Sequence, residues 1–383
     1  MFFMNMNAII AMIGMIIVLA LTRWWPHNKR YLLLAFNLCF LLLFSKKLFL
    51  FYLIYTAANY LCFLWLCYTS KWRKGGFILL IALNIAAVSG IRLLGMDSPD
   101  HLLFDAVITL TLIYNVLKVI DSHYFAYFFG KDARASAVDY ANYILFVPTF
   151  TSGPILKFRD FMADAKKPYQ VNSSQVEDGV KRIILGLFKK LVVVTWMTDV
   201  FQHVQQQELY THQSIFLMVW FYIMLYFDFS GYSDIAIGFG RLMGYNIPEN
   251  FKKPFTSPTL TQFWRNWHAT LGDWFRDHIF MFFSRKAPSK WTAAGLSILI
   301  MVLIGLWHGF GWIYFFYGLY HGVVIAIESL LGKSTVNKKK VSKSYYWARC
   351  ALTQLIVTVS VVVYSGSTET VSKIYRGLFH WPF

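Results

Sequence analysis

The chain has 383 residues, of which 57% are hydrophobic, 19% aromatic and only 14% charged. A soluble globular protein carries roughly 25% charged residues, so this composition excludes a soluble protein and indicates an integral membrane protein. The formal net charge is +17, which in a soluble chain would suggest nucleic-acid binding. Here the basic residues form short clusters between apolar runs, as the positive-inside rule describes, and we expect no nucleic-acid partner.

Apolar runs follow one another along most of the chain. They lie at about 4–22, 31–45, 48–69, 77–95, 102–121, 180–200, 213–238, 292–307, 312–331 and 345–364. A helix needs about 20 residues to cross the hydrocarbon core, and an isolated strand cannot satisfy its backbone there. We therefore predict an all-α integral membrane protein with about ten transmembrane helices, the first of which is a retained span and not a cleaved signal peptide.

The basic clusters set the orientation of these spans. Lys and Arg gather at 23–30, 71–74 and 338–340, whereas the loop at 201–212 has neither. The positive-inside rule places the three clusters in the cytoplasm and the 201–212 loop outside. The N-terminus is then expected outside.

Two regions are apolar but broken by proline and glycine. The segment 141–161 contains Pro148 and Pro154, and the segment 241–290 contains three further prolines before a Trp-rich amphipathic stretch. Irregular backbone at membrane depth persists only where it is buried in protein or lines a wet cavity. Both segments are therefore candidates for re-entrant structure around a site.

Carboxylates end one of the apolar runs. The run 213–227 leads into Asp228-Phe-Ser-Gly-Tyr-Ser-Asp234. Ionisable groups inside membrane segments are costly, so Asp228 and Asp234 are functional candidates by default. The alternative is a helix end at the interface, with both carboxylates paired to nearby Arg.

The stretch 262–277 has helical periodicity. Read as one helix, it places Phe263, Trp267, Leu271 and Trp274 on one face, Arg265, His268 and Arg276 on a second, and Asn266, Thr270, Asp273 and Asp277 on a third. Such a helix is either an interfacial anchor or the floor of a cavity that holds an anion.

A histidine follows the apolar run 292–307, in the sequence Gly305-Leu-Trp307-His308-Gly309. A histidine at this depth is either a structural hydrogen-bonding group or a base. The spacing of the ten histidines argues against di-iron and zinc-protease sites, and we find no nucleotide-binding motif or nucleophile elbow. A histidine that deprotonates an exogenous hydroxyl is the acid–base chemistry that remains.

These residues resemble the membrane-bound O-acyltransferase (MBOAT) family. The resemblance covers 221–283, including Phe-Trp-Arg-Asn-Trp-His268, and resumes at Trp307-His308-Gly309, at Tyr317-Gly-Leu-Tyr-His321-Gly and at Ser152-Gly-Pro154. It is to the bacterial cell-envelope branch, which contains teichoic acid D-alanyltransferases and O-acetyltransferases of alginate and peptidoglycan. Chain length favours the D-alanyltransferases, which we prefer. The amino-acid sequences at 229–234 and 186–190 are closer to those of the O-acetyltransferases.

The resemblance implies a site and an architecture. His308 and His268 are the expected catalytic residues, His321 is expected to be structural, and the expected substrate-binding residues are Trp307, Asn266, Arg265, Asp228, Asp234, Ser152 and Pro154. The implied fold is one polytopic domain over 1–383, with helices and re-entrant helices around a central tunnel. Its N-terminal helices are expected at 1–122, its catalytic core at 141–331, and its C-terminal helix and tail at 345–383.

The resemblance also implies partners. The acyl donor is expected to be a thioester, either on a phosphopantetheinyl carrier protein or as acetyl-CoA, and to approach from the cytoplasm. No bound cofactor or metal is expected. The acceptor is expected to be a cell-envelope polymer such as teichoic acid, reached with a membrane-tethered SGNH-hydrolase-like partner at the bacterial cell membrane. A non-enzymatic lipid or acyl transporter is the alternative from another class, and consumption of a thioester discriminates between them.

Overall fold

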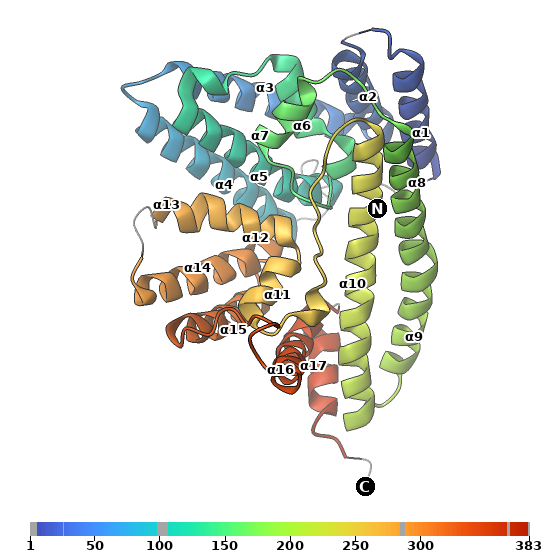
Figure 1. The fold of residues 1–383 in the computed structure, drawn as a ribbon, viewed down its shortest axis with the longest axis vertical. Helices are drawn as coiled ribbons and strands as arrows, with labels where there is room; N and C mark the ends of the chain where they lie inside the picture. The colour runs from blue at the N-terminus through green and yellow to red at the C-terminus, as the bar shows by residue number, and fades with distance from the viewer. Residues whose placement is uncertain (1–5, 26, 98–105, 284–287, 366–367, 382–383) are drawn as a thin grey trace. The chain divides into compact units, whose positions relative to one another are not determined.

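The structure is a computed structural model that describes residues 6–25, 27–97, 106–283, 288–365 and 368–381. Within these ranges it is helical and contains no strand (Figure 1). The chain separates into two compact units. The first is formed by Met1–Ile184 and Asp234–Pro248, and the second by Leu185–Ser233 and Glu249–Phe383.

The first unit contains the N-terminal helices. They are α1 (Met6–Leu21), α2 (Asn28–Phe44), α3 (Lys46–Tyr68), α4 (Arg73–Asp97), α5 (Ala106–Phe129), α6 (Ala137–Leu145), α7 (Phe158–Ala165) and most of α8 (Ser173–Phe188). Short 3-10 turns at Gly130–Ala133 and Val147–Thr149 interrupt the chain on either side of α6.

The second unit contains the remaining helices. They are a π-helical segment (Lys189–Val194), α9 (Thr195–Gln206), most of α10 (Thr211–Leu242), α11 (Leu260–Asn266), α12 (Ala269–Phe275), a second π-helical segment (Arg276–Phe280), α13 (Met281–Phe283), α14 (Lys290–His308), α15 (Trp312–Leu330), α16 (Lys343–Val361) and α17 (Thr368–Gly377). Short 3-10 turns occur at Pro254–Thr256 and Val362–Tyr364.

Six helices of the described chain are long and apolar enough to cross a membrane, so the protein is a multi-pass membrane protein. They are Lys46–Tyr68, Arg73–Leu93, Thr211–Leu242, Lys290–His308, Trp312–Leu330 and Lys343–Tyr364, and each coincides with a predicted run. The other four runs are less complete. Helices α1 and α2 have 16 and 17 residues, a π-helical segment interrupts 180–200, and 102–121 begins on residues outside the described ranges. The count of ten stays a prediction.

The segment 141–161 is irregular, as predicted. Helix α6 stops at Leu145 and α7 begins at Phe158, with buried residues between them. Polar side chains of α5 hold the irregular backbone: Asn115 Nδ2 donates to the carbonyl of Phe150 at 3.1 Å, and Lys118 Nζ donates to that of Tyr143 at 3.4 Å. These bonds supply the partners that a non-helical backbone needs when water is absent.

Helix α10 continues through both candidate carboxylates, so the predicted helix end at Asp228 is wrong. The reason is charge compensation within each unit. In the second unit Lys190 Nζ donates to Asp228, and in the first unit Arg182 pairs with Asp234. Paired carboxylates are tolerated inside a membrane segment where isolated ones are not. The structure thus supports the ion pairs of that alternative but not its helix end, with one lysine where an arginine was expected.

Helices α14 and α15 form a tight hairpin in the second unit (Figure 1). Their backbones approach so closely that a side chain would not fit between them. A Cβ atom on Gly305 would lie 2.2 Å from the carbonyl oxygen of Tyr314, and one on Gly318 would lie 2.4 Å from that of Met301. Small residues allow such approaches between membrane helices. This packing fixes the end of α14, where His308 lies.

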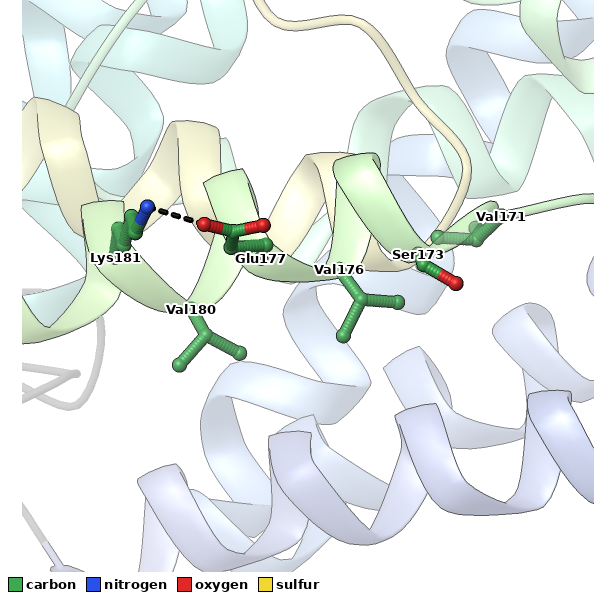
Figure 2. A pocket seen from close by; sticks show the side chains of 6 residues that line it. All are labelled: Val171, Ser173, Val176, Glu177, Val180 and Lys181. Carbon is green, nitrogen blue, oxygen red and sulfur yellow. Dashed lines mark hydrogen bonds and ion pairs between the residues drawn. The ribbon is translucent and has the colours of Figure 1, made fainter.

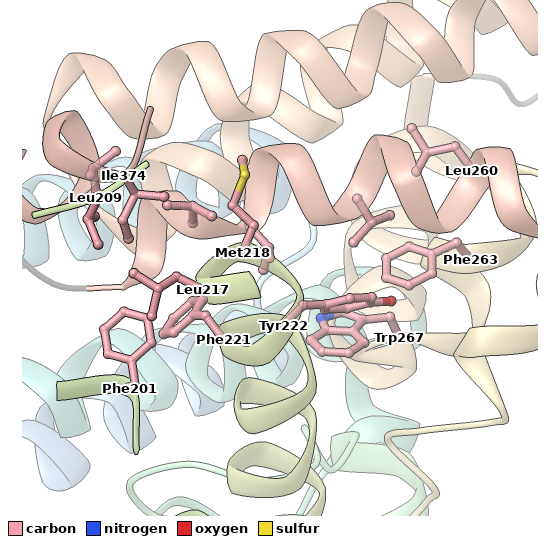
Figure 3. Close-up of a cluster of buried hydrophobic side chains, with 14 residues drawn as sticks. Phe201, Leu209, Leu217, Met218, Phe221, Tyr222, Leu260, Phe263, Trp267 and Ile374 are labelled. Carbon is pink, nitrogen blue, oxygen red and sulfur yellow. The ribbon is translucent and has the colours of Figure 1, made fainter. Parts of the chain in front are cut away.

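A cluster of buried hydrophobic side chains forms the core of the second unit (Figure 3). Helices α10, α11, α16 and α17 contribute to it, and Tyr222, Phe263 and Trp267 lie in the part nearest α11. The rings of Phe263 and Trp267 stack with centroids 5.5 Å apart. Trp267 directly precedes His268, so the core anchors the chain at the candidate site.

Candidate functional site

The helix predicted over 262–277 is broken at His268. Helix α11 ends at Asn266 and α12 begins at Ala269, and His268 between them has φ 46° and ψ 46°. Left-handed backbone is costly for residues other than glycine. Because the helix is interrupted at His268, the prediction of one continuous helix is wrong. The expected second face is also absent, because His268 is buried whereas Arg265 and Arg276 are exposed.

An irregular segment, 249–253, contacts the chain on both sides of the break. The N–H of Lys252 donates to the carbonyl of Asn266 at 2.8 Å, and the N–H of Ala269 donates to the carbonyl of Asn250 at 2.8 Å. These bonds satisfy backbone groups that the interrupted helix leaves unpaired. The conformation at His268 is thus stabilised by main-chain contacts on both of its sides.

The side chain of Asn250 fixes the tautomer of His268. Its Oδ1 lies 2.8 Å from Thr270 Oγ1, 3.4 Å from the N–H of Thr270 and 3.1 Å from His268 Nδ1. A backbone N–H can only donate, so this Asn250 atom is the acceptor oxygen. His268 Nδ1 consequently carries the proton, and Nε2 presents a lone pair.

The Nε2 atom of His268 is buried and has no hydrogen-bond partner among the described residues. Burial of the ring, together with the nearby His308, lowers the pKa of His268 to about 3. The imidazole is therefore neutral across the physiological range. A neutral ring nitrogen with a lone pair accepts a hydrogen bond from an incoming O–H or N–H group.

His308 lies close to His268, with Trp307 adjacent to both. The ring centroids of His268 and Trp307 are 6.3 Å apart, and those of Trp307 and His308 are 4.7 Å apart. The two imidazoles therefore lie at most about 11 Å apart, the sum of these two distances. One substrate can reach both rings if they lie within about 15 Å of one another. The cavity that they would share stays a prediction.

A further ring beside His308 is that of Tyr364, at the end of the span Lys343–Tyr364. Its centroid lies 5.1 Å from that of His308, in an edge-on arrangement. His308 itself is half-buried. The site therefore combines one half-buried and one fully buried imidazole within a shell of aromatic rings.

Other predicted site residues have structural contacts. Asn266 Nδ2 donates to Ser257 Oγ at 2.9 Å, and its carbonyl accepts from Lys252. Arg265 is exposed on α11. Asp228 is paired with Lys190, as described above. Asp234, Ser152 and Pro154 belong to the first unit. Substrate-binding roles for these residues stay predictions.

His321 differs from the other two histidines. It is fully buried, its Nε2 lies 2.8 Å from Ser360 Oγ, and its Nδ1 accepts a hydrogen bond from Trp264 Nε1 at 3.3 Å. Both ring nitrogens thus have protein partners. These contacts agree with the structural role expected from the sequence.

Two buried polar residues of the second unit were missed. Asn250 was missed because nothing in the sequence shows that it reaches His268, a residue 18 positions later. Glu328 lies in the apolar run 312–331, and its carboxylate accepts from the N–H groups of Leu260 and Thr261 at 2.8 and 2.9 Å. The cost of an ionisable group in an apolar run would have identified Glu328.

Metal ligands do not gather in the described ranges: no three His, Cys, Asp or Glu side chains are placed to hold an ion there. The absence of a metal from the reaction stays a prediction.

A pocket on α8 in the first unit has no catalytic character (Figure 2). Its walls are Val171, Val176 and Val180, with Ser173 and the ion pair of Lys181 and Glu177 at its edge. The two charged groups satisfy one another. The histidine site of the second unit is therefore the better functional candidate.

Comparison with known proteins shows which family and which relatives the chain is similar to. The sequence profile described as MBOAT, membrane-bound O-acyltransferase family, matches residues 9–337. A probable alginate O-acetylase of Pseudomonas syringae pv. tomato is 32% identical over 73% of this chain and 52% of its own length. The teichoic acid D-alanyltransferase of Bacillus subtilis is 34% identical over 54% of this chain and 53% of its own length.

A third relative is the peptidoglycan O-acetyltransferase of Helicobacter pylori, 29% identical over 52% of this chain and 38% of its own length. The chain thus spans about half the length of the curated relatives that it matches, or less.

Proposed function

Because the chain belongs to the membrane-bound O-acyltransferase family, we propose that it transfers an acyl group from a thioester to a hydroxyl group. The observation that carries this proposal is the pair of imidazoles around Trp307, one of which presents an unpaired, buried lone pair. A buried acceptor without a partner is costly in a folded protein. A substrate hydroxyl or amide that donates to it would offset that cost.

In the proposed mechanism His308 is the general base. It takes the proton of the acceptor hydroxyl as the oxygen bonds to the thioester carbonyl carbon. The carbon–sulfur bond then breaks, and the leaving thiolate takes the proton back from His308. General base catalysis of this kind contributes about 10²–10⁴-fold.

His268 orients a substrate in this mechanism. Its Nε2 is an acceptor, since the proton is on Nδ1 beside Asn250. In this tautomer Nε2 cannot donate to a developing oxyanion. A low pKa, about 3, makes it a weak base. Positioning the hydroxyl or the amide of the donor for His308 is the role that these properties favour.

The proposed acyl group is D-alanyl, with acetyl as the second candidate. The teichoic acid D-alanyltransferase of Bacillus subtilis has the higher identity of the two kinds of relative, at 34%. The alginate O-acetylases align over more of this chain, at 73%, which favours acetyl.

The proposed donor is a phosphopantetheinyl carrier protein or acetyl-CoA at the cytoplasmic side. The proposed acceptor is a cell-envelope polymer outside a bacterial cell membrane, reached with a membrane-tethered SGNH-like partner. No bound cofactor is proposed.

The test is thioester consumption by purified protein in proteoliposomes. Acetyl-CoA and a D-alanyl-loaded carrier protein are supplied separately, and released thiol is measured together with labelled acyl product. We expect release with one donor, and none from a His308→Ala variant that inserts normally. Transport of a labelled lipid or acyl compound with its thioester intact would support the transporter alternative instead.

A further inference from the structure

The connection between α15 and α16 forms the wall of a second pocket in the second unit. The pocket has a volume of about 820 Å³, and its polar lining includes Gln262, Asn337, Lys338, Lys340, Tyr345 and Tyr346. None of these residues belongs to the histidine site. The pocket therefore needs an explanation of its own.

The pocket is strongly cationic. Between Glu328 and Glu369 the sequence contains six Lys and Arg residues and no Asp or Glu. Within the described chain neither Lys338 nor Lys340 forms an ion pair. Lys338 Nζ instead lies 5.6 Å from the ring centroid of Tyr346 and 5.3 Å from that of Trp347. Two ammonium groups without a carboxylate favour an anionic ligand.

The loop that carries these lysines is held in place. The side chain of Gln262 on α11 bonds both to the N–H of Val336, at 2.8 Å, and to its carbonyl, at 3.3 Å. Thr259 Oγ1 donates to the carbonyl of Ser334 at 2.8 Å. A turn then closes with the N–H of Lys340 donating to the carbonyl of Asn337. A loop fixed in this way loses less conformational entropy on binding.

The pocket lies where the chain leaves one span and enters the next. Helices α15 and α16 both qualify as membrane spans, so the loop between them lies at the membrane surface. Tyr345 and Trp347 are exposed at the start of α16, as aromatic residues at a membrane interface are. The positive-inside rule assigns this loop to the cytoplasm, where the membrane leaflet is anionic.

The pocket is also connected to the histidine site through the chain. Tyr346 Oη donates to the carbonyl of Thr256 at 2.8 Å. Thr256 follows Asn250, the partner of His268, by only six residues. Six residues span at most about 20 Å, so the backbone that Tyr346 contacts lies within that distance of Asn250.

We propose that Lys338 and Lys340 bind the phosphate group of an anionic ligand in this pocket. Two sources supply this chemistry at a membrane surface: the headgroup of an acidic phospholipid and the phosphopantetheine of an acyl donor. Binding itself does not depend on acyl transfer. Only assignment to the donor rests on the function proposed above.

The test compares two double variants that remove the same charge. Lys338→Gln/Lys340→Gln removes both pocket lysines. Lys333→Gln/Lys339→Gln is the matched control, because these lysines belong to the same loop and do not line the pocket. Phosphatidylglycerol binding is measured by native mass spectrometry in nanodiscs with a phosphatidylcholine background. CoA binding is measured by calorimetry in phosphatidylcholine nanodiscs.

We expect the pocket variant to bind at least one probe about tenfold or more weakly, and the control to change by less than about twofold. A Lys338→Arg/Lys340→Arg variant should retain binding, which separates lost charge from misfolding. Loss of phosphatidylglycerol alone identifies a lipid headgroup, and loss of CoA identifies the donor. Equal weakening in both double variants, or no saturable binding of either probe to the native protein, would overturn the proposal.

Discussion

Two buried histidines of the second unit, His268 and His321, differ in their surroundings. His321 has partners on both ring nitrogens, Trp264 and Ser360, and belongs to a regular helix. His268 has a partner on Nδ1 alone and adopts a left-handed backbone conformation. Both rings are almost inaccessible to solvent. Burial therefore does not distinguish the two histidines, whereas the completeness of their hydrogen bonding does.

The two histidines also differ in the free energy that their conformation and burial cost the folded protein. An unsatisfied buried polar group costs about 1–3 kcal/mol, and left-handed backbone costs about 1–2 kcal/mol more. His268 bears both costs, and His321 bears neither. Strain concentrated at one residue is typical of functional sites, where the surrounding structure enforces it. Here the enforcing contacts are those of Asn250 and Lys252 with the broken helix.

The largest expected effect is on activity at the reactive pair. His308→Ala should lower acyl transfer by about 10²–10⁴-fold, because the general base is lost. His268→Asn should also lower it strongly, since asparagine tolerates the left-handed conformation but lacks the imidazole. The measurement is thiol release per correctly inserted molecule.

His321→Asn is the control for this comparison. It removes an imidazole of equal burial, so it should reduce stability while leaving turnover per folded molecule within a few-fold of native. An equal loss of turnover in all three variants would show that completeness of hydrogen bonding does not distinguish the sites.

The next largest effect is expected on stability, when the packing of α14 on α15 is disturbed. Gly318→Val places methyl groups where even a Cβ lies 2.4 Å from the carbonyl of Met301. We expect a loss of about 2–4 kcal/mol in stability, because overpacking here opposes backbone atoms. Thermal unfolding in detergent measures this loss. Activity of the remaining folded protein should fall as well, because α14 carries His308. A fully active folded variant would show that the site tolerates movement of α14.

A smaller effect is expected on the pH dependence of activity in an Asn250→Asp variant. In the native protein the pKa of His268 is about 3, because its charged form is buried. A carboxylate at Asn250 would favour the imidazolium and raise this pKa toward neutrality. Protonation converts Nε2 from an acceptor into a donor, so activity should fall as the pH is lowered from 8 to 6, by about tenfold. In the native protein His268 itself should contribute no inflection over this pH range, because its pKa is about 3.

The same pKa predicts a pH dependence of stability. The folded-state pKa lies below the unfolded value of about 6.5. The stabilising contribution of neutral His268 is therefore complete above about pH 6.5 and is lost as the pH falls toward 3.

The smallest expected effect tests the structural histidine. Ser360→Ala removes the hydroxyl that lies 2.8 Å from His321 Nε2. The expected cost is about 1 kcal/mol of stability, the net value of one buried hydrogen bond, with unchanged turnover. Thermal unfolding and thiol release measure the two quantities. Reduced turnover at native stability would instead assign His321 to the reaction.

The sequence predicted the helical membrane class and six spans that the structure contains. It did so because, in lipid, a continuous apolar run satisfies its own backbone hydrogen bonds only as a helix. It also predicted that 141–161 is irregular, since proline and glycine there oppose a helix. These features depend on local composition alone.

Long-range contacts explain what the sequence could not predict. The aromatic periodicity of 262–277 is compatible with a helix, and only the bonds from Asn250 and Lys252 show why it breaks at His268. In the same way Asp228 looked like a helix end until its lysine partner, 38 residues away, was located. Local periodicity carries no information about partners at such distances.

The hairpin of α14 and α15 has a consequence for biogenesis. Its connector has only three residues, 309–311, and these span at most about 11 Å, whereas the hydrocarbon core is about 30 Å thick. The connector cannot stretch across the bilayer, so neither helix can cross it while the other remains behind on the ribosomal side. The two helices must insert as one unit, with the glycine contacts of Gly305 and Gly318 formed during or soon after entry. A polar residue at the tip, His308, then reaches its final depth together with Trp307, the adjacent ring on α14.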